Sequence, residues 1–510
     1  MKWLAIACVV VVEGNTLRNT MVNVFRTPGV QHLLINASGV VDWPSDMDRQ
    51  SRANLAASAR GVCGVYDVNM VLKERSLAST GSDRHPVGLR HPTVTAELPP
   101  TLLAPTDIPS DERQSTTDSL KMSLAAFLQD VHADRPLSRP QDQQGARRAW
   151  EQTCAGDRMR PHETPRGVGD ALDIGLVFSD GGLSTLLRED GDGWTVDQRW
   201  MQQTSFGTAG VPAWFKADFK LDRSTGTLVA THIETALGDV WPESDGWAKA
   251  SQIVLFGAFA RITVREHLAV SHFVASLHAG AAIRDNRTPR PLFVAMLPHL
   301  HGSLAFHMAQ TPLLLRPNGL IHEAFSEHEY AAFEDYDRVL ASLRREDLSP
   351  PRAPYPSVTN TALREAYDTC ALYAGHLAAF GGHGFAQRAF AQLPVAPNLT
   401  LAEALTIVIY QGTFAHYAVS NMVIPYGAYV EFWTYDGLIG VMSTSLPTLS
   451  GTRPLLRDYA TEVGADAETA ALMRGFQRNL TLLENKWEQD WGKGHPDVPW
   501  PSKLGAGTLY

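Results

Sequence analysis

The stretch REHLAVSHFVASLH, residues 265–278, places three histidines among apolar residues. Its first two histidines, His267 and His272, are five positions apart. In a regular α-helix, residues with this separation diverge by about 140°, whereas residues four apart nearly align. Two imidazoles five apart can therefore meet on one metal only if the helix widens locally, as in a π-bulge, and such bulges are frequent at functional sites. The apolar residues between them predict a buried helix, where spare imidazoles are uncommon.

A second apolar segment, LTIVIYQGTFAHYAVS, carries His416 in a helix with no evident polar face, and Ser420 follows one turn later on the same side. The two segments could together form a mononuclear, nitrogen-rich metal site. No carboxylate is spaced to complete a two-histidine facial triad and no HExxH motif is present, so a zinc hydrolase would lack its general base. The alternative is three core histidines bonded to backbone carbonyls, and spacing alone does not separate the two interpretations.

Composition restricts the class of protein. The chain has 510 residues, of which 44% are hydrophobic and 19% charged, and this excludes a mainly disordered or fibrous protein. The formal net charge of -10 argues against a nucleic-acid partner, because no surplus of lysine and arginine is left to neutralise phosphates. The 18 histidines supply the commonest protein metal ligand, whereas the cysteines are too dispersed for a thiolate metal site or a disulfide framework. The cysteines are Cys8, Cys63, Cys154 and Cys370.

The second half of the chain is predicted to be mainly helical. Long segments with helical periodicity follow Trp247, and the stretch FKADFKLDRSTGTLVATHIETALG before them alternates apolar and polar residues as a β-hairpin does. Residues 84–144 are rich in proline, aspartate, serine and threonine, which is typical of a linker or long surface loop. We therefore expect an N-terminal segment of uncertain structure over residues 1–159 and a large helical domain with a small β element over 160–510. The apolar run at residues 3–12 is too short for a membrane span, and localisation stays open between the cytoplasm and secretion.

Several linked motifs resemble the lipoxygenase family, over about residues 180–510. HLAVSH resembles the family's pair of iron histidines, and LTIVIYQGTFAHYAVSNMVIPYGAY resembles the helix that carries the third. GTLVATHIE followed by WPESDGWAKA resembles the approach to the iron helix, and PHLHGSLAFHMAQTPLLLRPNGLIHE resembles the segment after it. Upstream, WTVDQRWMQQTSFGTAGVP resembles a further family signature. Several motifs in the family's order are more specific than any one of them.

The resemblance implies a mostly helical catalytic domain that holds one non-haem iron per chain. His267, His272 and His416 would be the imidazole ligands, Ser420 would occupy a fourth position, and the main-chain carboxylate of Tyr510 would be the final ligand. The family's substrates are a polyunsaturated fatty acid and O2. A ferric hydroxide abstracts a hydrogen atom from the doubly allylic carbon, and O2 adds to the resulting radical to give a lipid hydroperoxide.

The same resemblance implies a substrate channel beside the iron. Leu314 and Ile321 would line it, although plain core packing accounts for these two residues equally well. Gln310 stands where the family has a small residue that influences the position of oxygenation. Thr263 and Val423 stand where the family has polar groups that orient the iron ligands.

These departures from the family pattern keep two other functions open. One is a lipoxygenase-like protein without competent iron, which binds a lipid or has a structural role. The other is a redox enzyme that acts on a different substrate. In each case we expect a monomer with at most peripheral membrane contact.

Overall fold

The computed structural model describes most of the chain after residue 165 and two short strands before it. The N-terminal segment expected over residues 1–159 lies outside the described residues, apart from those strands. Four of the residues that the resemblance assigns to the site also lie outside them: Gln310, Leu314, Ile321 and Tyr510. The described residues are 89–90, 104–105, 166–168, 171–208, 211–300, 303–304, 325, 331–351, 355–382, 384–394, 398–423, 426, 430 and 454–508.

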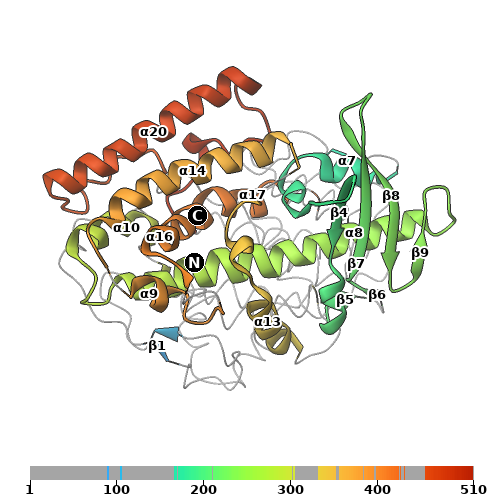
Figure 1. The fold of residues 1–510 in the computed structure, drawn as a ribbon, viewed down its shortest axis with the longest axis horizontal. Helices are drawn as coiled ribbons and strands as arrows, with labels where there is room; N and C mark the ends of the chain where they lie inside the picture. The colour runs from blue at the N-terminus through green and yellow to red at the C-terminus, as the bar shows by residue number, and fades with distance from the viewer. Residues whose placement is uncertain are drawn as a thin grey trace, which may run out of the picture. The chain divides into compact units, whose positions relative to one another are not determined.

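The alternating stretch FKADFKLDRSTGTLVATHIETALG forms the central hairpin of a five-stranded antiparallel sheet, as its pattern predicts (Figure 1). One face of the hairpin is buried because α7 (Ile174–Ser179) and α8 (Trp247–Arg261) pack against it, and this face carries alternate residues such as Phe215 and Ala217. In sheet order, the strands are β3 (Arg188–Asp190), β4 (Gly193–Asp197), β7 (Phe215–Asp222), β8 (Thr227–Thr235) and β9 (Gly238–Val240).

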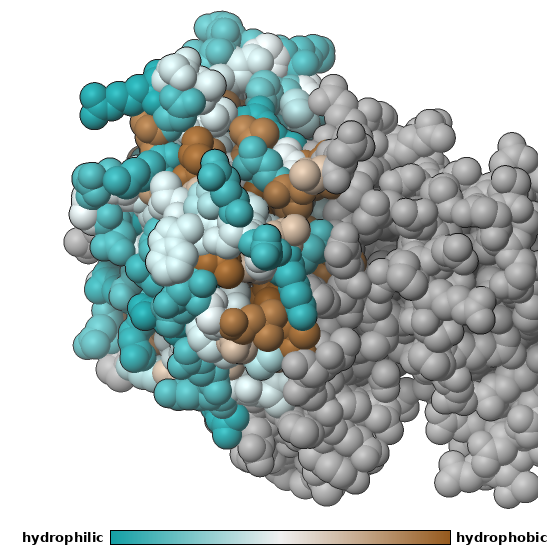
Figure 2. All heavy atoms as spheres, turned by 90° about the vertical axis from the view of Figure 1, so that its right-hand side faces the viewer, coloured by the Kyte–Doolittle hydropathy of each residue, from teal (hydrophilic) through white to brown (hydrophobic). Residues whose placement is uncertain are grey.

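The end of the protein that carries this sheet is shown in Figure 2. Its surface is mainly hydrophilic, with hydrophobic side chains scattered among the polar ones. The large apolar side chains exposed on β7, on β8 and on either side of β9 are Leu221, Val229, Leu237 and Trp241. Scattered apolar side chains of this kind are normal on a protein surface.

Helix α8 continues without interruption into η4 (Ile262–His278), a π-helix, and then into α9 (Ala279–Ile283). Together they form the long green helix that runs across Figure 1. Only Glu266 and His272 in η4 are not fully buried. The widening that the five-residue histidine spacing requires is therefore present, and it extends over the whole segment around the two histidines.

A second interrupted helix packs against η4. It consists of α16 (Leu401–Tyr410), the short π-helix η7 (Gln411–Ala415) and α17 (His416–Ser420), and all three parts contact η4. It begins at a capping box, in which the Thr400 hydroxyl accepts from the Glu403 amide and the Glu403 carboxylate accepts from the Thr400 amide. The second π-helix ends immediately before His416.

Two further long helices, α14 (Val358–Ala378) and α20 (Ala467–Trp491), lie above the long green helix in the view of Figure 1. Helix α14 contacts both α16 and α20. Each begins at a side-chain cap, Ser357 for α14 and Asp466 for α20. No helix among the described residues combines the length and the apolar character that a bilayer span needs. For the described residues, the prediction of a mainly helical protein with a small β element is confirmed.

Shorter elements complete the described part. The helices are η2 (Gly182–Leu186), η3 (Arg199–Gln203), α10 (Arg290–Leu300), α13 (Ala331–Ser342), η5 (Arg345–Leu348), α15 (Phe385–Ala389) and η8 (Pro501–Lys503). Two further antiparallel pairs are formed by β1 (Leu89–Arg90) with β2 (Ala104–Pro105) and by β5 (Gly207–Thr208) with β6 (Val211–Pro212).

Candidate metal centre

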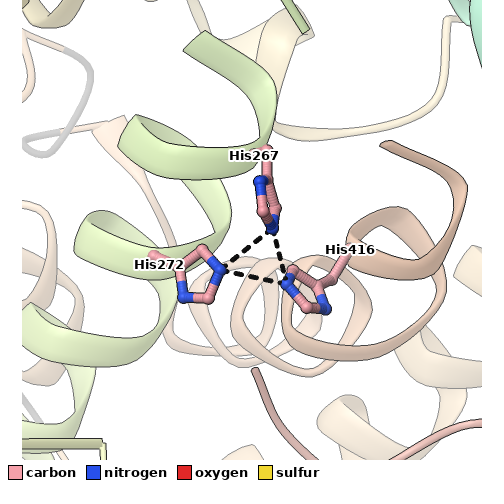
Figure 3. A group of neighbouring side chains, drawn as sticks. All are labelled: His267, His272 and His416. Atoms are coloured by element: carbon pink, nitrogen blue, oxygen red, sulfur yellow. Dashed lines mark hydrogen bonds between the residues drawn. The ribbon is translucent and has the colours of Figure 1, made fainter. Parts of the chain in front are cut away.

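The imidazoles of His267, His272 and His416 converge on one point (Figure 3). The Nε2 atom of His267 lies 2.9 Å from that of His416 and 3.0 Å from that of His272. The third side of the triangle, between His272 and His416, is 3.1 Å. His267 and His416 are buried and His272 is partly exposed, so the cluster lies mainly in the core.

The local helix geometry explains why His267 and His272 point the same way. Hydrogen bonds in a π-helix join residues five apart, so such residues lie above one another rather than diverging. Both histidines belong to η4 and therefore present their rings on one face. His416 is 149 residues from His267 in the sequence and reaches the same point because its helix packs across η4.

Hydrogen bonding alone does not account for this triangle. The Nε2 atom of a neutral imidazole is either a donor or an acceptor. Among three atoms that all contact one another, at least two must have the same role, so at least one contact opposes two hydrogens or two lone pairs. A metal cation accepts all three lone pairs at once.

The separations are compatible with a single ion. Nitrogen ligands about 2.1 Å from one metal lie about 3.0 to 3.4 Å from one another. The Nε2 atoms are 2.9, 3.0 and 3.1 Å apart, so the three imidazoles fit one metal ion.

Ser420 is buried in α17, but its hydroxyl is bonded elsewhere. It donates to the carbonyl oxygen of His416, at 2.5 Å, and lies 3.1 Å from Oδ1 of Asn421. A serine inside a helix can reach the carbonyl four residues earlier, which competes with any other role for the hydroxyl. The structure thus places Ser420 beside a cluster residue without a hydrogen bond to any of the three imidazoles.

The last described residues run between the two histidine-bearing helices. The hydroxyl of Thr508 is hydrogen-bonded to that of Ser276, which lies one turn beyond His272 in η4. A Cβ added at Gly412, one turn before His416, would lie 3.9 Å from the methyl carbon of Thr508. Thr508 is therefore held within one helical turn of both ligand-bearing positions.

His299 and Gly507 fix the approach of this segment. The Nδ1–H of His299 donates to the carbonyl oxygen of Ala506 at 2.6 Å. A Cβ at Gly507 would lie 2.4 Å from the His299 carbonyl oxygen, so only glycine permits the close approach. Burial lowers the pKa of His299 to about 4, and its hydrogen bond to Ala506 opposes this effect. The ring is therefore neutral near pH 7 and serves as a donor to the main chain.

Sequence reasoning missed a polar network behind the cluster. It involves Glu266 and Ser271, which directly precede His267 and His272, and also Gln411 at the start of η7. One signal was available: Glu266 stands five residues after Arg261, which is the same spacing as the histidine pair. Thr263 and Val423, the positions where polar groups are expected by resemblance, are both buried.

The chain matches no protein-family model and no curated protein. Among solved structures, it is similar to a calcium-dependent 11R-lipoxygenase, with a TM-score of 0.63 and 13% identity over 85% of this chain and 80% of that one. A LOX deletion variant, solved anaerobically in complex with arachidonate, gives a TM-score of 0.60 and 13% identity over 85% and 81%. Coral 8R-lipoxygenase gives 0.52 and 12% identity over 69% and 62%. The chain therefore has a lipoxygenase-like fold.

Proposed function

We propose that this protein is a non-haem iron dioxygenase that inserts O2 into a polyunsaturated fatty acid to give a lipid hydroperoxide. The observation that carries the proposal is the triangle of Nε2 atoms from His267, His272 and His416, with sides of 2.9 to 3.1 Å, on a lipoxygenase-like fold. Both the metal and the substrate are inferred from this combination.

Three imidazoles can hold iron, zinc or copper, and the lipoxygenase-like fold is what favours iron among these metals. A bound iron would supply the one-electron redox chemistry that removes a hydrogen atom from a doubly allylic carbon. The burial of His267 and His416 keeps bulk water away from the donor atoms and holds the rings in fixed orientations.

Three neutral imidazoles leave the charge of the metal uncompensated, so an anionic donor completes the proposed set. We assign this role to the main-chain carboxylate of Tyr510. Support comes from Thr508, two residues earlier, which is anchored to Ser276 on the histidine-bearing helix. The Ser420 hydroxyl is a poor donor and already serves the His416 carbonyl, so we propose only a weak or water-bridged contact there.

The substrate proposal rests on the solved LOX structure in complex with arachidonate. A polyunsaturated fatty acid contains the doubly allylic carbon that this chemistry requires. We propose that Gln310, Leu314 and Ile321 contact the acyl chain, as the resemblance implies. The lipoxygenase-like protein without iron and the redox enzyme on another substrate are the competing functions that the following test separates.

The test is the formation of conjugated dienes, followed by ultraviolet absorbance, when the iron-loaded protein is incubated with linoleate and O2. We expect diene absorbance to rise with O2 consumption, and both to be lost in His272→Ala. Iron binding without diene formation would favour a different substrate, and a protein that takes up no iron and forms no diene would favour the lipoxygenase-like protein without iron. Diene formation that persists in His272→Ala would contradict the assignment of the centre.

A further inference from the structure

Glu266 lies immediately before His267 and forms ion pairs with two buried arginines. Its Oε1 atom accepts from Nε of Arg261 at 3.1 Å and lies 3.6 Å from Nη1 of Arg265. Both arginines are at least nine-tenths buried, with 7% and 6% of their surfaces exposed. Burial, and next the like charge of Arg265, lowers the pKa of Arg261 to about 10, so Arg261 is still a cation at neutral pH. The Glu266 carboxylate is therefore the anion that both guanidinium groups face on η4.

The Arg261–Glu266 pair depends on the same helix register as the histidine pair. Arg261 and Glu266 are five residues apart, as are His267 and His272. In an α-helical register, each pair would diverge by about 140°. The ion pair, which joins the last residue of α8 to η4, and the histidine contact within η4 are therefore both compatible with the π-helical register.

Arg265 connects the π-helix η4 to a separate element, the 3-10 helix η5. Its Nη2 donates to Oδ2 of Asp347 at 2.7 Å and lies 3.4 Å from the carbonyl oxygen of Ser342. Asp347 belongs to η5 and also accepts from the Arg344 amide at 2.7 Å, which fixes its carboxylate. The helix that carries His267 is thus pinned to the η5 turn through a buried ion pair.

Further hydrogen bonds link η5 to the helix of His416 and lead back to Glu266. Leu348, next to Asp347, accepts at its carbonyl from Nε2 of Gln411 at 3.1 Å. The Ser271 hydroxyl lies 3.4 Å from Oε1 of Gln411 and donates to the Glu266 carbonyl at 3.1 Å. The circuit therefore runs from Glu266 through Arg265, η5, Gln411 and Ser271 back to Glu266. It touches the residue before His267, the residue before His272 and the start of the π-helix before His416.

We propose that Glu266 is a positioning residue of the metal centre. With Arg261 and Arg265, it holds η4 in the π-helical register that brings the Nε2 atoms of His267 and His272 to 3.0 Å. Ser271 and Gln411 couple this register to the helix of His416. The inference rests on the proposed metal site and adds to it the residues that set the geometry of its ligands.

The test uses Co²⁺ binding to the full-length, metal-free protein. Glu266→Gln keeps the size of the side chain and removes its charge. We expect its dissociation constant for Co²⁺ to rise by roughly 10- to 100-fold, and the visible ligand-field spectrum of bound Co²⁺ to shift, because the ligand imidazoles are no longer held in place. The matched control is Asp285→Asn. Asp285 also faces two arginines, with Arg287 at 2.7 Å and Arg388 at 3.5 Å, but it lies outside the circuit. The control should leave the dissociation constant and the spectrum unchanged.

A second variant separates positioning from general stability. Ser271→Ala breaks the circuit without removing a charge, and we expect a smaller change of the same sign in affinity and in spectrum. Glu266→Asp retains the carboxylate and should recover part of the lost affinity.

If Glu266→Gln lowers the melting temperature but leaves affinity and spectrum as in the wild type, the inference is wrong. If Glu266→Gln does not fold, Ser271→Ala decides by the same criterion. A wild-type protein that binds no Co²⁺ would contradict the proposed metal site as well, whereas binding that is indifferent to all three variants contradicts this inference alone.

Discussion

The importance of His267, His272 and His416 rests on the convergence of their three Nε2 atoms. The sequence indicated the first two through their spacing and the third through its apolar helix, and the structure brings all three Nε2 atoms within 3.1 Å of one another. Ser420 stays a predicted weak ligand. Its hydroxyl is bonded to the carbonyl one turn earlier, a contact that sequence position alone cannot rank against metal coordination.

His299 allows a prediction at the same scale. Burial holds its folded pKa near 4, below its ordinary value of 6.5. Between these values the unfolded chain binds a proton that the folded protein does not, so stability is complete above pH 6.5 and is lost as the pH falls toward 4. At pH 5 the loss from this residue is about 2 kcal/mol. Chemical denaturation at pH 7.5 and pH 5 should show a smaller pH dependence in His299→Gln, which keeps a donor for Ala506. Equal pH dependence in both proteins would contradict the assignment.

At the scale of elements, the sequence indicates the π-helices only indirectly. The spacing of His267 and His272 required a local widening, yet the observed π-helix covers all of η4, and a second one, η7, precedes His416. Two of the residues proposed to support this register, Asp347 and Gln411, lie far from it in the sequence. No local pattern could identify them, because the contacts depend on how distant helices pack.

The C-terminal segment gives a prediction at the scale of elements. Gly507→Ala would place a methyl group 2.4 Å from the His299 carbonyl oxygen. We expect a loss of stability of about 1–3 kcal/mol and weaker metal binding, because Thr508 would shift away from Ser276. The matched control is Gly375→Ala, in the last turn of α14 with open space around it, which should stabilise by up to about 0.5–1 kcal/mol. Thermal unfolding and Co²⁺ titration measure both effects. Unchanged metal affinity in Gly507→Ala would show that the C-terminal segment does not influence the metal centre.

At the scale of the whole molecule, the order of the motifs predicted the lipoxygenase-like fold that the solved structures support at 12–13% identity. The β-hairpin and the helical character of the second half followed from periodicity, since period-2 and helical patterns reflect which face is buried. The division at residue 160 and the roles of Gln310, Leu314 and Ile321 stay predictions. They depend on segments that carry little periodic signal.

The central claim is that two helices distant in sequence hold one iron through His267, His272 and His416. Metal analysis of the purified protein, expressed with sufficient iron, tests it most directly. We predict about one iron per chain in the wild type and a near-complete loss in His272→Ala, because two imidazoles leave the site too weak to retain the metal. A wild-type protein without iron, or His272→Ala with its full iron content, would contradict it.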